Sequence, residues 1–147
     1  MKSVSPYLNF NGNTEEAFIF YRSVFGGEFS EPGMSLNLCR SEKFPPSDQK
    51  KVMHMGLPLG NAGAIYGSDV PESMRSMLMF GTNNHIIIEA ESEEEAKRLF
   101  DGLSKGGKVM MPLDKTFWGA LYGAFADKFG VQWMINYTYP KPPLTAP

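Results

Sequence analysis

The sequence predicts an α+β domain made of two βαβββ modules whose curved sheets enclose a cleft. Two observations support this prediction: a helical pattern occurs twice, and runs of β-favouring residues flank both copies. Six landmarks of the pattern recur 79 positions apart, at Asn13/Ser92, Ala17/Ala96, Phe20/Leu99, Tyr21/Phe100, Val24/Leu103 and Gly27/Gly106. The 147 residues suit one domain with its own hydrophobic core.

The first module begins with the strand candidate "PYLNFN" (6–11), which the same offset of 79 lays over "HIIIEA" (85–90). A helix is predicted over 13–27, with Asn13 as the N-cap residue. Three further strands are predicted over 28–38, 51–60 and 62–70.

The second module repeats this order after its first strand, 85–90. Its helix, predicted over 92–107, opens with the capping box Ser92/Glu95 and ends at a glycine pair. Strands are predicted over 108–113, 119–127 and 131–137.

Polar and proline-bearing segments separate these elements. Residues 40–50 are expected to form an exposed loop, and residues 71–84 to link the modules. We therefore predict a single domain over 1–137, with module one at 1–70 and module two at 85–137. The Pro-rich tail, 138–147, is expected to be extended.

Charge and composition exclude several classes of partner. The net charge is −2 and the basic residues form no stripe, so nucleic acid is not an expected partner. No apolar run approaches the roughly 20 residues of a membrane span. The single cysteine, Cys39, forms no disulfide framework, and the N-terminus lacks a signal-peptide core, so a cytoplasmic location is expected. No glycine-rich phosphate loop is present, and no cofactor is expected.

Three segments carry a more specific signal: "NGNTEEAFIFYRSVFGGE", "KVMHMGLPLG" and "MPLDKTFWGALYGAFADKFGVQWMINY". With the repeat, they resemble the PhnB-like branch of the vicinal-oxygen-chelate superfamily. That superfamily also holds glyoxalases, extradiol dioxygenases, fosfomycin-resistance enzymes and bleomycin-resistance proteins. The resemblance implies the predicted fold and a small-molecule cleft, but one fold hosts many chemistries.

In the superfamily's enzymes, a divalent metal is held by residues on the first and last strands of each module. The resemblance places these positions on Ser5 or Pro6, near Tyr66, on His85 and on Met134. Of these residues, His85 alone is a usual ligand, so no metal is expected.

The resemblance and strand alternation place His85, Ile87 and Glu89 on the cleft side of one strand. His85 and Glu89 are therefore the candidate catalytic residues, for proton transfer. A structural histidine at a strand end and a surface glutamate remain alternatives. Glu89 is also suited to holding a cationic ligand.

Five residues are candidates for ligand binding: His54, Trp118, Tyr122, Gln132 and Asn136. On the last strand, alternation separates Gln132 and Asn136 from an opposite face that includes Trp133. Trp118 and Tyr122 would form an apolar wall, although Trp118 as core is the simpler interpretation. Strand alternation alone also accounts for His54.

Two functions therefore stay open. One is a glyoxalase-like protein that binds a small oxygenated metabolite and performs metal-free lyase or isomerase chemistry. The other is a non-catalytic binder of a small molecule or antibiotic, resembling the bleomycin-resistance proteins. A homodimer is expected in both cases, because related folds commonly pair and the aromatic content suits an apolar interface.

Overall fold

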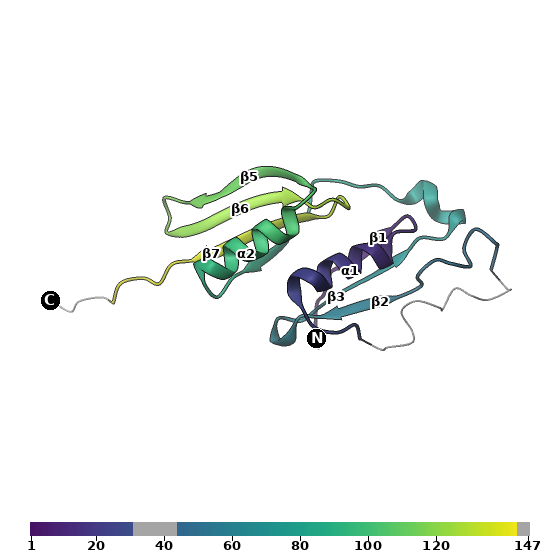
Figure 1. Ribbon diagram of the computed structural model, residues 1–147, viewed down its shortest axis with the longest axis horizontal. Coiled ribbons are helices and arrows are strands. Elements are labelled where there is room, and N and C mark those ends of the chain that lie inside the picture. The colour runs from purple at the N-terminus through teal and green to yellow at the C-terminus, as the bar shows by residue number, and fades with distance from the viewer. Residues whose placement is uncertain (31–43, 144–147) are drawn as a thin grey trace. The chain divides into compact units, whose positions relative to one another are not determined.

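The computed structural model describes residues 1–30 and 44–143. Within these ranges the chain forms two compact units, Met1–Met79 and Phe80–Pro147, each with one α-helix and one sheet (Figure 1). Unit 1 contains β1 (Tyr7–Phe10), α1 (Thr14–Phe25), β2 (Met55–Pro58), η1 (Gly60–Ala62), β3 (Ala64–Asp69) and η2 (Glu72–Met77). Unit 2 contains β4 (Ile86–Glu89), α2 (Glu93–Ser104), β5 (Lys108–Lys115), β6 (Ala120–Ala126) and β7 (Gln132–Thr138). The predicted α+β class is confirmed.

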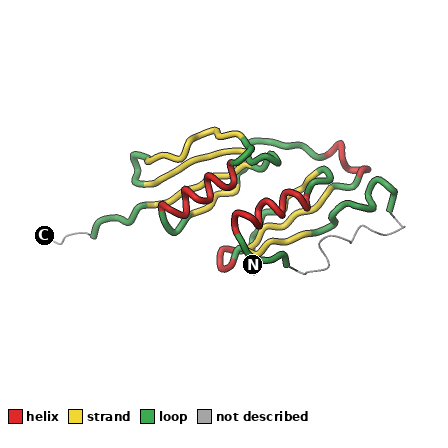
Figure 2. The backbone as a smooth tube through the Cα atoms, in the orientation of Figure 1, coloured by secondary structure: helices red, strands yellow, loops and turns green. Residues whose placement is uncertain are grey.

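Both sheets follow one topological rule, in which the first strand of a unit pairs in parallel with its last strand. The sheet of unit 1 has the order β1-β3-β2, and that of unit 2 has the order β4-β7-β6-β5. Strands β1 and β3 pair in parallel, as do β4 and β7, whereas the other pairs are antiparallel. The helix of each unit lies on one face of its own sheet (Figure 2).

The helix of each unit buries its apolar stripe against the sheet. In α1 the buried residues include Ala17, Phe18 and Tyr21, and the Phe18 ring meets Phe10 edge-on. In α2 the buried residues are Ala96, Leu99, Phe100 and Leu103. Phe100 packs edge-on against Phe125 of β6, with ring centroids 5.0 Å apart. The stripe read from the sequence is therefore the core-forming face of α2. In α1 the buried face is rotated toward Phe18, since Phe20 and Val24 of the predicted stripe are only half-buried.

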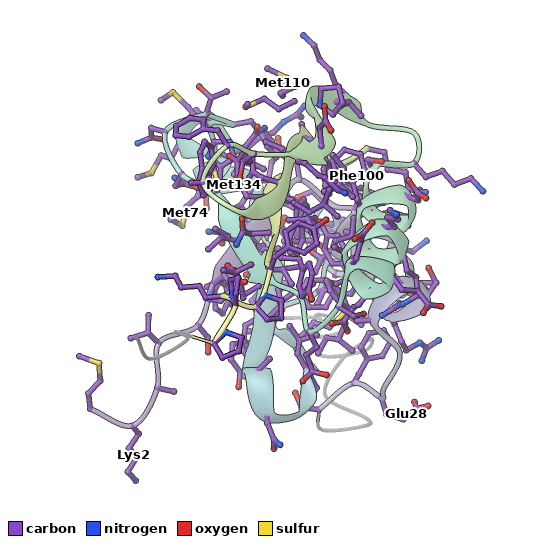
Figure 3. All side chains as sticks on the ribbon, turned by 90° about the vertical axis from the view of Figure 1, so that its left-hand side faces the viewer. Lys2, Glu28, Met74, Phe100, Met110 and Met134 are labelled. Carbon is purple, nitrogen blue, oxygen red and sulfur yellow. The ribbon has the colours of Figure 1, made fainter. Side chains whose placement is uncertain are left out.

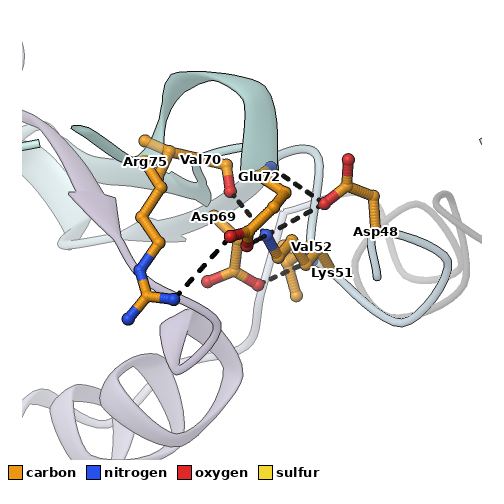
Figure 4. A network of polar contacts seen from close by, with 7 residues as sticks. All are labelled: Asp48, Lys51, Val52, Asp69, Val70, Glu72 and Arg75. Carbon is orange, nitrogen blue, oxygen red and sulfur yellow. Dashed lines mark hydrogen bonds and ion pairs between the residues drawn. The ribbon is translucent and has the colours of Figure 1, made fainter. Parts of the chain in front are cut away.

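The predicted N-cap of the first helix needs a correction. Asn13 occupies the cap position but makes no side-chain cap hydrogen bond. Instead, Asp69 at the end of β3 accepts from Thr14 N at 3.1 Å and from Thr14 Oγ1 at 2.6 Å. Its second oxygen accepts from Val52 N at 2.8 Å (Figure 4). In α2 the predicted cap is confirmed, since Ser92 Oγ accepts from Glu95 N.

The offset of 79 holds for the bounds of the helices but is wrong for the first strands. The burial of β1 and that of β4 are out of phase at 79 and agree at 80, where Phe10 matches Ala90 and Asn9 matches Glu89. A one-residue slip reverses the two faces of a strand, which explains the mismatch. The extra residue lies in the turn before α1, where Gly12 adopts a φ of 88°.

Several predicted boundaries also change. Of the strand predicted over 28–38, Ser30 forms an isolated bridge to Gly56, and 31–38 lies outside the described residues. Only Met55–Pro58 of the 51–60 prediction is strand. The predicted linker contains the 3₁₀ helix η2. Cys39 also falls outside the described residues.

The segment before β2 is held by a polar network that the expectation of an exposed loop did not include (Figure 4). Asp48 is buried and accepts from Glu72 N at 3.0 Å and from Lys51 Nζ at 2.9 Å. Lys51 Nζ also donates to Val70 O at 3.1 Å. The hydrogen bond from Lys51, followed by that from Glu72 N, lowers the pKa of the Asp48 carboxyl. This network ties the start of η2 to the body of unit 1.

Candidate functional site

The sheet of unit 2 has a helix face and an open face, and most of the candidate residues belong to the open one. On β7, Trp133 and Ile135 are fully buried on the side of α2, whereas Gln132, Met134 and Asn136 are half-buried. The predicted alternation of this strand is therefore confirmed. On β4, Ile87 and Glu89 are exposed and pair with Met134 and Asn136.

Glu89 is the most organised group on the open face. Its Oε2 accepts from Asn136 Nδ2 at 2.5 Å, and its Oε1 accepts from Thr138 N at 2.9 Å. These bonds, with that from Asn136 the largest contribution, lower the pKa of the Glu89 carboxyl below its ordinary 4.5 despite an opposing effect of desolvation. A carboxylate that is stabilised in this way is a weaker base and a firmly positioned acceptor.

The two candidate catalytic residues are not brought together. His85 immediately precedes β4, four positions before Glu89 along the chain. Four residues of extended strand span roughly 13 Å, so the two side chains do not meet at one reacting atom. When the β4–β7 register is extended by one residue beyond Ile86, His85 falls opposite Gln132. The Gln132 Nε2 donates to Gly130 O at 3.3 Å.

Tyr122 and Trp118 differ in their surroundings. Tyr122 is half-buried on β6 and lies directly across from Asn136 on one side and from Asp114 on the other. Trp118 lies in the β5–β6 connection, is 61% exposed and stacks edge-on against Phe117. The core interpretation of Trp118 is therefore wrong, and its role in ligand binding stays a prediction.

His54 belongs to unit 1, on the open face of the three-stranded sheet. Its ring lies nearly parallel to Tyr66, with centroids 5.5 Å apart, and its Nδ1 is 3.2 Å from the hydroxyl of Tyr7. Tyr7 and Tyr66 are register partners on β1 and β3. His54 therefore forms a small aromatic cluster with two tyrosines that the sequence analysis did not connect with it.

The residues at the superfamily's metal positions do not fit a divalent cation. Tyr66 is engaged with His54, and Met134 offers a thioether beside the apolar Ile87. Hard and borderline cations prefer carboxylate and imidazole donors. Over residues 1–30 and 44–143, no three or more His, Cys, Asp and Glu side chains group so as to hold a metal ion.

Asp127 is a key residue of unit 2 that the sequence analysis missed. It is buried, and its Oδ1 accepts from Phe129 N at 2.8 Å and from Val131 N at 3.1 Å. Its Oδ2 accepts from the indole Nε1 of Trp133 at 2.8 Å. An aspartate just before a glycine-containing turn is the signal that could have identified it. Asp127 thereby fixes the β6–β7 turn and the start of the strand that carries Gln132.

Comparisons with known proteins agree with this architecture. The chain is 30% identical to protein YjdN of Escherichia coli (strain K12) over 150 residues, covering 95% of this chain and 97% of that protein. The structure of PA1353 from Pseudomonas aeruginosa matches with a TM-score of 0.78 and 36% identity, covering 94% of this chain and 98% of that one. A PhnB protein from Bacillus cereus matches with a TM-score of 0.70 and 25% identity, covering 93% and 100% of the two chains.

No helix within the described ranges is long and apolar enough to cross a membrane. A family model matches residues 4–135, in agreement with the repeat, the sheet topology and the PhnB-like neighbours. The chain belongs to the Glyoxalase/Bleomycin resistance protein/Dioxygenase superfamily.

Proposed function

We propose that the open face of the unit 2 sheet binds a small oxygenated metabolite. The observation that carries this proposal is the Glu89 carboxylate, which Asn136 and Thr138 hold in one orientation on an exposed face. A side chain that is already oriented loses less conformational entropy when a ligand binds.

The surroundings of Glu89 have the mixed character of a small-molecule site. Gln132 and Asn136 supply hydrogen-bonding groups, and Tyr122 supplies a half-buried ring. Ile87 and Met134, which are register partners on β4 and β7, supply adjoining apolar surface. A few polar groups set among apolar side chains are typical of ligand pockets.

Of the two functional classes, the geometry favours the binder. Proton transfer by Glu89 is disfavoured because its hydrogen bonds stabilise the ionised form. His85, just before β4, and Glu89, at its end, also lie too far apart to act as an acid–base pair on one atom. In the enzymatic alternative, a metal-free lyase or isomerase, His85 would transfer the proton and Glu89 would orient the substrate.

A thermal-shift screen of oxygenated metabolites, followed by calorimetry on the hits, tests the binding function. Glu89→Gln keeps the shape of the side chain but removes its charge, so we expect at least a tenfold loss of affinity, about 1.4 kcal/mol. Glu94→Gln makes the same change on the exposed surface of α2 and should leave affinity unchanged. Equal affinity of the wild type and Glu89→Gln for every hit would overturn the proposal.

Incubation of each hit with the protein, monitored by proton NMR, separates the two classes. Conversion of a hit that is lost in His85→Ala would establish the enzyme. Binding without conversion would establish the non-catalytic binder.

A further inference from the structure

The open face of the unit 2 sheet is ordered by charge along its strands. The hydrogen-bond registers arrange its side chains in three rows that cross the sheet from β4 to β5. Register partners project from the same face, so each row can be assigned from the pairings alone.

The first row is basic. Lys108 pairs with Ala126, which pairs with Gln132, and the position of His85 continues the row onto the segment before β4. Lys108 is exposed, and His85 and Gln132 are half-buried. This row presents an ammonium group, an imidazole and an amide, all of which can donate hydrogen bonds to an oxyanion.

The second row is apolar. Met111 pairs with Ala124, Ala124 with Met134, and Met134 with Ile87. Ile87 is 61% exposed and Met111 is 52% exposed, a large apolar area for a sheet face. Met and Ile side chains of this kind suit the hydrocarbon part of a ligand.

The third row is acidic. Glu89 pairs with Asn136, Asn136 with Tyr122, and Tyr122 with Asp114. The two carboxylates stand at the outer strands, and the amide and phenol stand between them. The nearby cation Lys115 projects from the other face of β5, where its Nζ lies 5.8 Å from the centroid of the Tyr139 ring.

We propose that the metabolite bound here is bifunctional, with an amine or guanidine at the Glu89/Asp114 row, a carboxylate or other oxyanion at the His85/Lys108 row, and an apolar body between them. This inference rests on the proposed function and adds the charge pattern of the ligand. The outer rows lie four residues apart along β6 and β7, which corresponds to roughly 13 Å. On β5 they lie six residues apart, because two register shifts fall between Lys108 and Asp114. A ligand with both charges on one carbon, such as a simple α-amino acid, spans too little of this distance.

Amino carboxylates of increasing chain length test the proposal: 6-aminohexanoate, 8-aminooctanoate and 11-aminoundecanoate. Octanoate and octylamine each keep one charge and serve as matched controls. Binding is measured from changes in the ¹H–¹⁵N NMR spectrum of the whole protein. We expect one of the longer amino carboxylates to bind about fivefold more tightly than either control, the upper end of what one exposed ion pair contributes.

Variants at the two ends then assign the orientation. Asp114→Asn with Glu89→Gln should abolish the advantage over octanoate, and Lys108→Gln with His85→Gln should abolish the advantage over octylamine. Glu94→Gln should preserve both advantages.

Two results would overturn the charge pattern and leave the proposed function intact. In one, a metabolite from the screen carries a single charge and is sensitive to Glu89→Gln but not to Lys108→Gln. In the other, the single-charge controls bind as tightly as the amino carboxylates. If neither the probes nor any screened metabolite perturbs the open face, both proposals fail.

Discussion

At the scale of single residues, the ionised state of Glu89 makes stability depend on pH. Its pKa in the folded protein is below the ordinary 4.5, so its contribution is present above the unfolded pKa and is lost as the pH falls through the folded value. Between about pH 6 and about pH 3, the free energy of unfolding of Glu89→Gln should therefore fall by less than that of the wild type. Urea titrations at several pH values measure this difference, and Glu94→Gln should behave as the wild type does. An unchanged pH profile in Glu89→Gln would contradict the prediction.

Asp127 contributes to stability through three acceptor contacts rather than through ligand chemistry. In Asp127→Asn, one oxygen becomes an NH₂ group, which cannot accept from the Trp133 indole or from the turn amides. We expect a loss of about 1–3 kcal/mol, because a buried donor is left unsatisfied. Urea unfolding followed by tryptophan fluorescence gives the value, and Asp101→Asn on the exposed surface of α2 is the control. A loss equal to that of the control would show that the network is not needed.

The sequence indicated residue types better than their partners. The side of β7 that carries Gln132 and Asn136 followed from alternation alone, because burial on one face imposes a period of two. The bonds from Asn136 and Thr138 to Glu89 depend on the pairing of β4 with β7, which are 47 and 49 residues apart at these contacts. No local pattern encodes that register, so the support for Glu89 could not be predicted.

At the scale of elements, the helix of unit 2 packs closely on its sheet at Gly123. A Cβ at this position would lie 2.6 Å from Phe100 Cε2 and 3.0 Å from the backbone of Leu113. Gly123→Ala should therefore cost about 1–3 kcal/mol through overpacking. Thermal or urea unfolding measures the loss. Gly81→Ala, where the new Cβ would meet only Asn83 Oδ1 at 3.3 Å, is the matched control and should be near neutral.

Both helices were predicted within two or three residues, because capping residues, an apolar stripe and terminal glycines agree locally. The burial pattern of β1 was not predicted correctly. An alignment based on the helix landmarks does not detect the extra residue in the turn that contains Gly12. Likewise, the cap of α1 comes from Asp69, 55 positions from Thr14. A tertiary partner, Asp69, thus replaces the local cap that was predicted at Asn13.

At the scale of the whole molecule, the internal repeat predicted the superfamily fold because both units open with a strand and a helix and pair their first strand in parallel with their last. A repeat of this kind constrains topology, but it does not identify a ligand. The charge rows of unit 2 arise from residues that differ between the two copies. On the open face of unit 1, Asn9 occupies the position that matches Glu89, and Tyr7 and Tyr66 occupy those that match Ile87 and Met134 of the apolar row.

The outer strand of unit 2 gives a prediction about assembly. Strand β5 lies at the end of its sheet's order and exposes two consecutive apolar side chains outside the ligand rows, Val109 and Met110. Met110 points outward (Figure 3). Exposed apolar surface on an outer strand favours association with another chain. We therefore predict a homodimer of about 33 kDa, twice the 16.4 kDa of the chain, joined in part through β5.

Sedimentation equilibrium measures this association. Met110→Lys places a charge on β5 of each protomer and should weaken dimerisation at least tenfold, about 1.4 kcal/mol, because the ammonium group would lose water on burial. Val4→Lys introduces the same charge at an exposed N-terminal position and should leave the dissociation constant of the dimer unchanged. A dimer that resists Met110→Lys would place its interface away from β5, and a monomeric wild type would contradict the prediction of a homodimer itself.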